Sequence, residues 1–249
     1  MKRKISLSLL LIVVFTVSLV AHLPARLAVN YLPASMGVRL AGVDGTVWQG
    51  TAKQVSWQNK PMGRLSWEVH LLQLFLGKAD VSVELRGGVN GLDGKGHVGV
   101  SFGGPYATDF ILSAPAEMVL RNVPAPIPVT ATGSVNLVVK RYEFASPWCK
   151  ELDGRLNWVN GAVSSPVGDI SAGDAMANLS CNAGSLSVRG DSKSASLTSN
   201  FSLELAPDQS YKVDGWFIPG SEFPNQLRQQ LSWLGQPDSN GRYPLKFNG

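Results

Sequence analysis

Apolar and polar residues alternate along most of the chain from Val38 onward. The alternating sets are Leu65/Trp67/Val69, Val81/Val83/Leu85, Val98/Val100/Phe102, Val135/Leu137/Val139, Leu156/Trp158, Leu186/Val188, Phe201/Leu203/Leu205 and Tyr211/Val213/Phe217. A period of two puts successive side chains on opposite faces of a strand, one buried and one wet. Antiparallel pairing suits such strands, because parallel sheets need continuous apolar runs and crossover helices. The sequence therefore predicts an all-β fold.

Composition and turn chemistry agree with many short strands. Charged residues make up 16% of the chain, below the roughly 25% of a typical soluble domain, and there are 26 Gly and 15 Pro. Four dipeptides offer the positive-φ positions of tight hairpins: Asp44-Gly45, Asp93-Gly94, Asp153-Gly154 and Asn160-Gly161. The segment 94–99 matches G-x-G-x-x-G, but the residues after it cannot continue as a helix, so we expect a glycine-rich hairpin there.

A proline-rich segment at 124–128 interrupts the strand-rich region. Such a segment is extended and can link a first half over 38–122 to a second over 129–217. The sequence thus leaves two arrangements open after the N-terminal segment: one curved antiparallel sheet, or a two-part β domain.

The N-terminus carries a basic cluster followed by an apolar run. Residues 2–4 are Lys-Arg-Lys, and the run over 5–23 would form a helix about 28 Å long, close to the hydrocarbon thickness of a bilayer. The positive-inside rule would keep residues 1–4 in the cytoplasm. We expect a transmembrane helix over 5–23, a linker over 24–37 and a β-rich domain over 38–249 across the membrane.

A cleaved signal peptide is the alternative, because it has a similar layout. The run is longer than a usual signal core, and Leu19 and Ala21 fit a cleavage site poorly. Both interpretations place the rest of the chain outside the cytoplasm. There, Cys149 and Cys181 are expected to form a disulfide, since exported compartments favour oxidation; two buried free thiols are the alternative.

Local signatures of chemistry are missing from the sequence. The net charge of +4 is concentrated at the N-terminus, and no basic run interleaves with aromatics, so a nucleic-acid partner is not expected. No local motif of a hydrolase, a metalloprotease or a nucleotide-binding loop occurs. His70 and His97 have no acid or cysteine at ligand spacing, although tertiary proximity could still build a site. We therefore expect no enzyme activity, no cofactor and no metal.

One helix is expected near the end, over 221–235. Its apolar residues fall on one face at helical spacing, and Gly235 is a natural C-cap. The helix would either cover the sheet or dock a partner. The candidate contact residues are Phe223, Leu227, Leu231, Leu234 and, on a strand before them, Trp216.

Several segments resemble the type II secretion system protein N family of Gram-negative bacteria. They are LAGVDGTVWQGTA at 40–52, GRLSWEV at 63–69, LDG at 152–154 and GRYPL at 241–245, together with the paired cysteines and the single apolar span. The resemblance covers essentially the whole length and is most specific in GTVWQG with the downstream L-x-W.

This resemblance implies a single-pass inner-membrane protein with a periplasmic β domain. The family is an accessory part of the machine that moves folded proteins across the outer membrane, and it carries over no catalytic residues. We therefore expect a non-enzymatic scaffold whose partners are other inner-membrane platform subunits. The alternative is a periplasmic protein that binds or transfers lipid, because a curved sheet with one apolar face can hold acyl chains.

Overall fold

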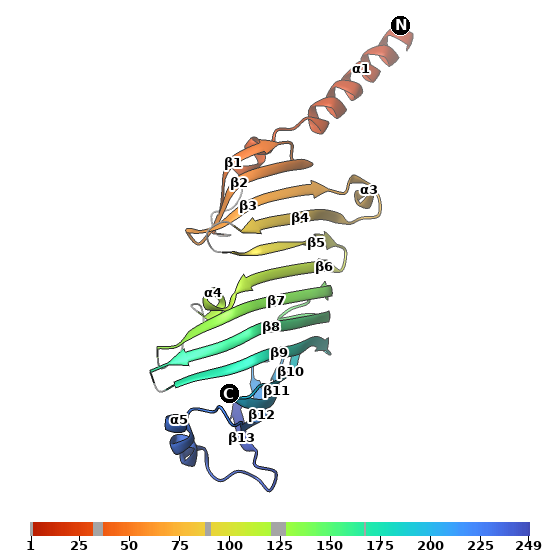
Figure 1. The fold of residues 1–249 in the computed structure, drawn as a ribbon. Helices are drawn as coiled ribbons and strands as arrows, with labels where there is room; N and C mark the ends of the chain where they lie inside the picture. Colours follow the sequence, from red (N-terminus) through yellow and green to blue (C-terminus); the bar gives the residue numbers. More distant parts are fainter. Residues whose placement is uncertain (1, 32–36, 88–90, 121–127, 167) are drawn as a thin grey trace.

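A single antiparallel sheet forms the body of the protein (Figure 1). The computed structural model describes residues 2–31, 37–87, 91–120, 128–166 and 168–249, except for the side chains of residues 2–9 and 233. Thirteen strands pair in sequence order. They are β1 Val38–Gly45, β2 Gln49–Trp57, β3 Lys60–Val69, β4 Ala79–Gly87, β5 Asp93–Ser101, β6 Gly104–Pro115, β7 Thr130–Glu143, β8 Glu151–Ser165, β9 Gly168–Asn182, β10 Ser185–Lys193, β11 Leu197–Leu205, β12 Tyr211–Pro219 and β13 Tyr243–Asn248. The expected all-β fold is confirmed.

The sheet continues without a break through the middle of the chain. β6 pairs directly with β7, with Phe110 opposite Val139 and Leu112 opposite Leu137. Of the two arrangements left open by the sequence, the described strands have the curved antiparallel sheet, in which β6 and β7 are direct neighbours. The proline-rich segment, apart from Pro128, lies outside the described residues.

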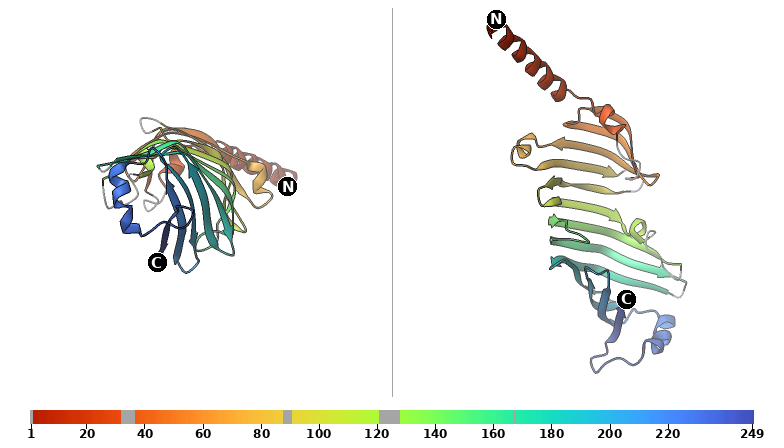
Figure 2. Two further views of the ribbon diagram at one scale, coloured as in Figure 1. Left: turned by 60° about the horizontal axis from the view of Figure 1, so that its bottom comes forward. Right: turned by 180° about the vertical axis from the view of Figure 1, so that it is seen from behind.

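One face of the sheet is apolar along its length. The register aligns apolar side chains from strand to strand, as in Leu65 opposite Leu85, and Leu112, Leu137 and Leu156 on successive strands. We call this the apolar face. The end-on view in Figure 2 shows the sheet curved like a gutter, with the short helices α2 (Ala25–Val29) and α4 (Ala116–Leu120) inside the curve.

The tightest packing lies where α2 covers the first strands. Ala25 of α2 is 2% exposed and Ala52 of β2 is fully buried, and both belong to a cluster with Val43 and Val55. Leu65 and Trp67 pack against this cluster from β3. The buried alanines allow α2 to approach the sheet closely, so this end of the apolar face is closed.

One of the four predicted turns begins a strand, another lies inside a strand, and a third lies at a bulge. Asp93-Gly94 is in β5 and Asp153-Gly154 is in β8, while Asn160-Gly161 marks a bulge in β8 where Asn160 has φ 51°. The expected glycine-rich hairpin at 94–99 is likewise part of β5. Pairing with a neighbour on each side overrides the local turn preference of these residues.

The hairpin turns themselves use less obvious residues. Gln58 and Asn59 join β2 to β3 with φ 48° and 65°, the two positive values of a type I′ turn. Only Asp44-Gly45 lies at the end of its strand as expected, with Gly45 at φ 95° before the β1–β2 connection.

Helix α1 (Lys2–Ala21) projects from the β1 end of the sheet (Figure 1). Its described side chains begin at Leu10. Within the part of the chain that the structure describes, none of the helices combines the length and the apolar character needed to cross a bilayer. The fold therefore does not establish the transmembrane helix expected over 5–23.

The helix expected over 221–235 is shorter and in two pieces. α5 spans Asn225–Gln230 and a 3₁₀ turn follows over Leu231–Leu234. Pro224 precedes the helix in an extended conformation. A proline is tolerated at a helix start because its missing N–H would have no partner within the helix there. Gly235 ends the 3₁₀ turn with φ 93°, as its expected capping role requires.

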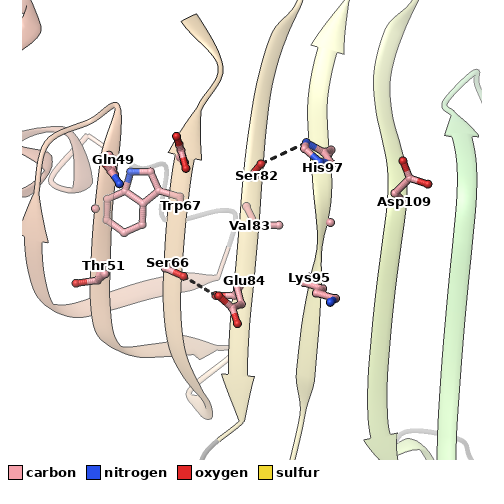
Figure 3. Close-up of a pocket in the computed structure, with 13 residues that line it drawn as sticks. Gln49, Thr51, Ser66, Trp67, Ser82, Val83, Glu84, Lys95, His97 and Asp109 are labelled. Carbon is pink, nitrogen blue, oxygen red and sulfur yellow. Dashed lines mark hydrogen bonds between the residues drawn. The ribbon is translucent and has the colours of Figure 1, made fainter.

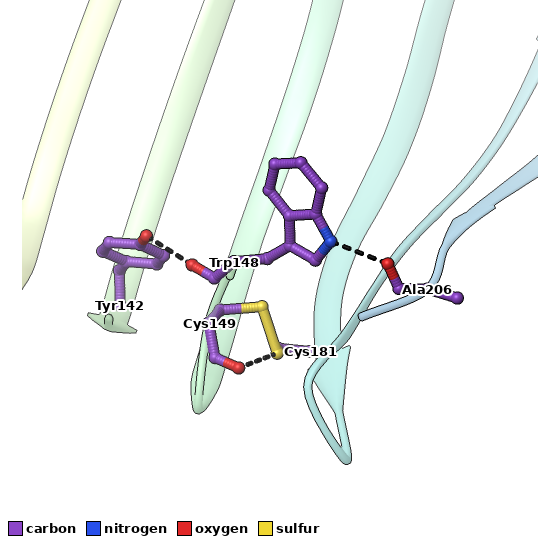
Figure 4. The surroundings of a disulfide bond; sticks show 5 residues. All are labelled: Tyr142, Trp148, Cys149, Cys181 and Ala206. Atoms are coloured by element: carbon purple, nitrogen blue, oxygen red, sulfur yellow. Dashed lines mark hydrogen bonds between the residues drawn. A yellow bond between two sulfur atoms is a disulfide. The ribbon is translucent and has the colours of Figure 1, made fainter. Parts of the chain in front are cut away.

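A disulfide joins Cys149 to Cys181, in agreement with the expectation from the sequence (Figure 4). Cys149 lies in the connection between β7 and β8 and is 2% exposed, and Cys181 lies near the end of β9. Next to it, Tyr142 donates a hydrogen bond to the carbonyl oxygen of Trp148 at 2.8 Å. The disulfide therefore fixes the β7–β8 connection against β9.

Candidate functional site

A polar cleft of about 700 Å³ lies over strands β2 to β6 (Figure 3). Ser66, Glu84 and Lys95 occupy one row across β3, β4 and β5, on the face opposite to Leu65 and Leu85. Carboxylates outnumber amines among the lining residues. The lining residues that carry polar side chains are Gln49, Thr51, Ser66, Glu68, Ser82, Glu84, Lys95, His97 and Asp109. The cleft is therefore hydrophilic and weakly acidic, unlike an acyl-chain pocket.

At one end of the cleft, two histidines converge on a buried aspartate. His70 directly follows β3, Asp80 lies near the start of β4, and His97 lies in β5. Asp80 is 8% exposed, and its Oδ1 lies 3.3 Å from His97 Nδ1 and 3.8 Å from His70 Nε2. Ser82 Oγ lies 2.6 Å from His70 Nε2 and 3.3 Å from His97 Nδ1. We call these four residues the His–Asp cluster.

A tyrosine holds the second carboxylate oxygen of Asp80. Tyr106 donates a hydrogen bond from its hydroxyl to Asp80 Oδ2 at 2.7 Å. Burial, followed by the hydrogen bond to Asp80 and its negative charge, raises the pKa of Tyr106 to about 12. The phenol therefore stays protonated and orients the carboxylate toward the histidines.

The cluster does not have the geometry of a nucleophilic triad. In a triad, the acid bonds to one imidazole nitrogen and the nucleophile to the other. Here His70 presents the same nitrogen, Nε2, to Ser82 and to Asp80, and His97 presents the same Nδ1 to both. The nitrogens converge on a point, as ligands do, and do not form a proton relay.

A second surface feature is apolar and exposed. α3 (Leu71–Leu74) connects β3 to β4, and Phe102 forms the tip of the β5–β6 hairpin beside it, close to Gly77. Phe75 is 88% exposed and Phe102 is 96% exposed. We call this the α3 patch. Its exposed residues are Leu71, Leu72, Leu74, Phe75, Leu76, Val100 and Phe102.

The α3 patch lies close to the base of α1. The indole Nε1 of Trp48 donates to the carbonyl oxygen of Val20 in α1 at 2.8 Å. The carbonyl oxygen of Trp48 accepts from the backbone N–H of Val69 at 2.7 Å, one residue before His70. α1 and the α3 patch therefore extend from the same end of the strands, as Figure 1 also shows.

The expected contact residues near the C-terminus are mostly turned inward. Phe223 is 6% exposed and stacks on Phe217 of β12, and Leu231 is 7% exposed. Leu227 is half-buried near the start of β9, and Leu234 is 43% exposed. Half-buried Trp216 lies under the guanidinium of Arg242, at 4.5 Å from the ring centroid. This arrangement favours a covering role for the segment, and only Leu234 presents a large exposed surface.

Comparison with known proteins decides the family. The family model described as type II secretion system (T2SS), protein N, matches residues 36–246. The chain belongs to the type II secretion system protein N family. A family member from Vibrio cholerae serotype O1 is 42% identical over all of this chain and 99% of its own length. The member from Aeromonas hydrophila is 34% identical over all of this chain and 99% of its own length. The member from Klebsiella pneumoniae is 28% identical over all of this chain and 97% of its own length. No solved structure matches the chain.

The sequence missed both the His–Asp cluster and the α3 patch. The cluster depends on strand register, since Ser82 faces His97 and Asp80 faces Gly99 across β4 and β5. The patch had a local signal that was passed over: the run Leu-Leu-Gln-Leu-Phe-Leu at 71–76 breaks the period of two. Where such a run proves to be exposed in the fold, it marks an interaction site.

Proposed function

We propose that the chain is a single-pass inner-membrane component of the type II secretion system, with its sheet in the periplasm. In this role it is a non-enzymatic scaffold that supports export of folded proteins by holding inner-membrane platform subunits together. Membership in the family supports a role in the type II secretion system, and the exposed apolar side chains of α1 support the membrane anchor.

The observation that carries the proposal is the exposure of α1. Every large apolar side chain from Leu10 to Val20 is between 44% and 69% exposed, and the helix projects away from the sheet (Figure 1). Burying one such side chain in an apolar medium stabilises by about 1.5–3 kcal/mol. A row of them therefore favours insertion into lipid, and the basic residues 2–4 would remain on the cytoplasmic side.

The α3 patch is our candidate for the contact surface with platform subunits. It lies next to the base of α1, so anchoring in the bilayer would hold it near the membrane surface. A tether of this kind raises the effective concentration of weak contacts without any new interaction. Exposed Phe and Leu side chains are typical of protein–protein interfaces.

The tether is tested by exchanging it. Residues 2–21 are replaced by a cleavable signal, which releases the sheet into the periplasm, and secretion of a reporter is measured. We expect secretion to fall and the full-length protein to resist extraction with alkaline buffer. Full secretion by the released domain would contradict the scaffold role, and a tag after residue 249 that reports from the cytoplasm would contradict the orientation.

A lipid-binding or lipid-transfer protein is the second candidate. The apolar face of the sheet favours it, because Leu112, Leu137 and Leu156 are only partly buried and lie on consecutive strands. Mass spectrometry of gently purified protein separates the two functions. Phospholipid in a stoichiometric amount supports the lipid function, and a lipid-free protein supports the scaffold.

A further inference from the structure

We propose that His70, Asp80 and His97 bind one zinc ion, with the hydroxyl of Ser82 or a water as the fourth ligand. The site is separate from the α1 anchor and the apolar face. The three side chains each offer one ligand atom, and these atoms all lie within 4.8 Å of one another. Imidazole nitrogens with a carboxylate are a ligand set that zinc takes in proteins.

Three of the four nitrogen–oxygen distances are close to those around a tetrahedral ion; the fourth, 2.6 Å from His70 Nε2 to Ser82 Oγ, must lengthen if Ser82 is a ligand and can stay if a water is. Zinc binds nitrogen and carboxylate oxygen at about 2.0–2.2 Å, which puts neighbouring ligands in a tetrahedron roughly 3.4 Å apart. His97 Nδ1 lies 3.3 Å from both Asp80 Oδ1 and Ser82 Oγ. His70 Nε2 lies 3.8 Å from Asp80 Oδ1, so a small rotation of the imidazole would complete the site.

A hydrogen-bonded network without metal is the alternative, and it leaves both contacts of His97 Nδ1 long. Hydrogen bonds from nitrogen to oxygen are usually 2.7–3.2 Å long, and both contacts of His97 Nδ1 are 3.3 Å. Ser82 can donate its proton to His70 Nε2, 2.6 Å away, and accept a longer bond from a protonated His97 Nδ1, 3.3 Å away. A cation at the convergence point satisfies both nitrogens and the carboxylate together.

The surroundings of Asp80 are those of a supported ligand. Metal-bound carboxylates are commonly held by a further hydrogen bond, which fixes their orientation. Tyr106 donates this bond to Asp80 Oδ2, and the backbone N–H of His70 donates to the carbonyl oxygen of Asp80 at 2.9 Å. The ligands therefore lie at the end of β3 and on β4 and β5, and the pairing of these strands fixes their relative position before any ion arrives.

A zinc ion here would join the end of β3 to β4 and β5. His70 immediately precedes α3, so the same ion would fix the start of the segment that carries the α3 patch. Occupancy would thus order this exposed loop.

The proposal is tested with zinc alone on the full-length chain in detergent micelles. Protein stripped with a chelator is titrated with zinc in competition with a chromophoric chelator. We expect one zinc ion per chain. His70→Gln, Asp80→Asn and His97→Gln should each weaken binding more than about 100-fold, and Tyr106→Phe by about 10- to 100-fold.

The third histidine supplies the matched control. His22 directly follows α1, its Nδ1 contacts the carbonyl oxygen of Ser18 at 2.8 Å, and it is not one of the three converging ligands, so His22→Gln should leave zinc affinity within about twofold. Cobalt offers a second readout: bound in the wild-type site it should give the intense visible absorption of a tetrahedral complex, and His97→Cys should add a thiolate-to-cobalt band. No zinc uptake by wild type, or uptake unaffected by all three ligand substitutions, would overturn the proposal; circular dichroism shows that each variant is folded.

Discussion

The indole Nε1 of Trp148 donates a hydrogen bond to the carbonyl oxygen of Ala206 at 2.9 Å, across 58 residues of sequence (Figure 4). Trp148 lies in the connection between β7 and β8, and Ala206 follows β11. Most strand contacts in this sheet join neighbours in sequence. This bond, beside the Cys149–Cys181 disulfide, therefore ties the middle of the sheet to its C-terminal strands.

Removing the disulfide should destabilise the C-terminal half of the sheet. The cysteines are 32 residues apart, and a loop of this size gives a stabilisation of about 3–4 kcal/mol in the chain-entropy account. Cys149→Ala/Cys181→Ala should lower the free energy of unfolding by roughly that amount, as measured by urea unfolding with tryptophan fluorescence. Reductant should destabilise the wild type similarly and leave the double variant unchanged; equal stability of the two proteins in oxidising buffer would refute the expectation.

Trp148→Phe should loosen the turn after β11 without breaking the disulfide. The substitution keeps an aromatic ring but removes the N–H, at a cost of about 0.5–1.5 kcal/mol for one hydrogen bond. Hydrogen exchange should speed up for the backbone amides at 206 and 208–210. Trp57→Phe serves as the control, because Trp57 is 48% exposed in a distant hairpin; faster exchange at these amides in that variant would show that the effect is not specific.

Gly50→Ala should disturb the closed end of the apolar face. A Cβ at Gly50 would lie 2.4 Å from the indole ring of Trp67 and 2.8 Å from the carbonyl oxygen of Asp44. Trp67 must then shift, and its hydrogen bond from Nε1 to the carbonyl oxygen of Val47 is lost. Overpacking of this kind costs about 1–3 kcal/mol.

The control for Gly50→Ala is Gly103→Ala. Gly103 is exposed, and the nearest atom to an added Cβ there is 3.6 Å away. Thermal unfolding should therefore change little for Gly103→Ala, within about 0.5 kcal/mol. A similar loss for both variants would mean that the position of Trp67 does not matter.

Substitutions in the α3 patch should reduce secretion while leaving the fold intact. Phe75→Ser and Phe102→Ser replace side chains that are 88% and 96% exposed, so stability should change by less than about 0.5 kcal/mol. Cross-linking to platform subunits in intact membranes should fall, together with secretion of a reporter. Tyr31→Ser is the control, since Tyr31 is 86% exposed outside the patch; unchanged cross-linking in the patch variants would remove the patch as a contact surface.

Alternation predicted the strands well where a side-chain period was enough. Val81 and Val83 lie in β4 and Val98 in β5, as expected, because the period of two is a property of one strand alone. Phe102, the last residue of its set, lies in the turn after β5, since the pattern does not show where a strand ends. The helix in the structure is shorter than the one expected over 221–235, because it begins only after Pro224.

Most contacts between strands could not be predicted from the sequence. The disulfide could be expected, because an exported compartment favours oxidation of the two cysteines. The convergence of His70 and His97 on Asp80 could not, because it requires the register of two hairpins and not a motif. The burial of Phe223 could not be assigned with certainty either, since a helical stripe alone allows both covering and docking.

The strictly sequential order of the thirteen strands also bears on how the molecule comes into being. Each new strand needs only the one just made as its template, so little loop entropy separates successive pairing steps. A polypeptide delivered N-terminus first could therefore fold one hairpin at a time as each strand emerges. The hydrogen bond between Trp148 and Ala206 must then form late, because Ala206 is delivered long after Trp148.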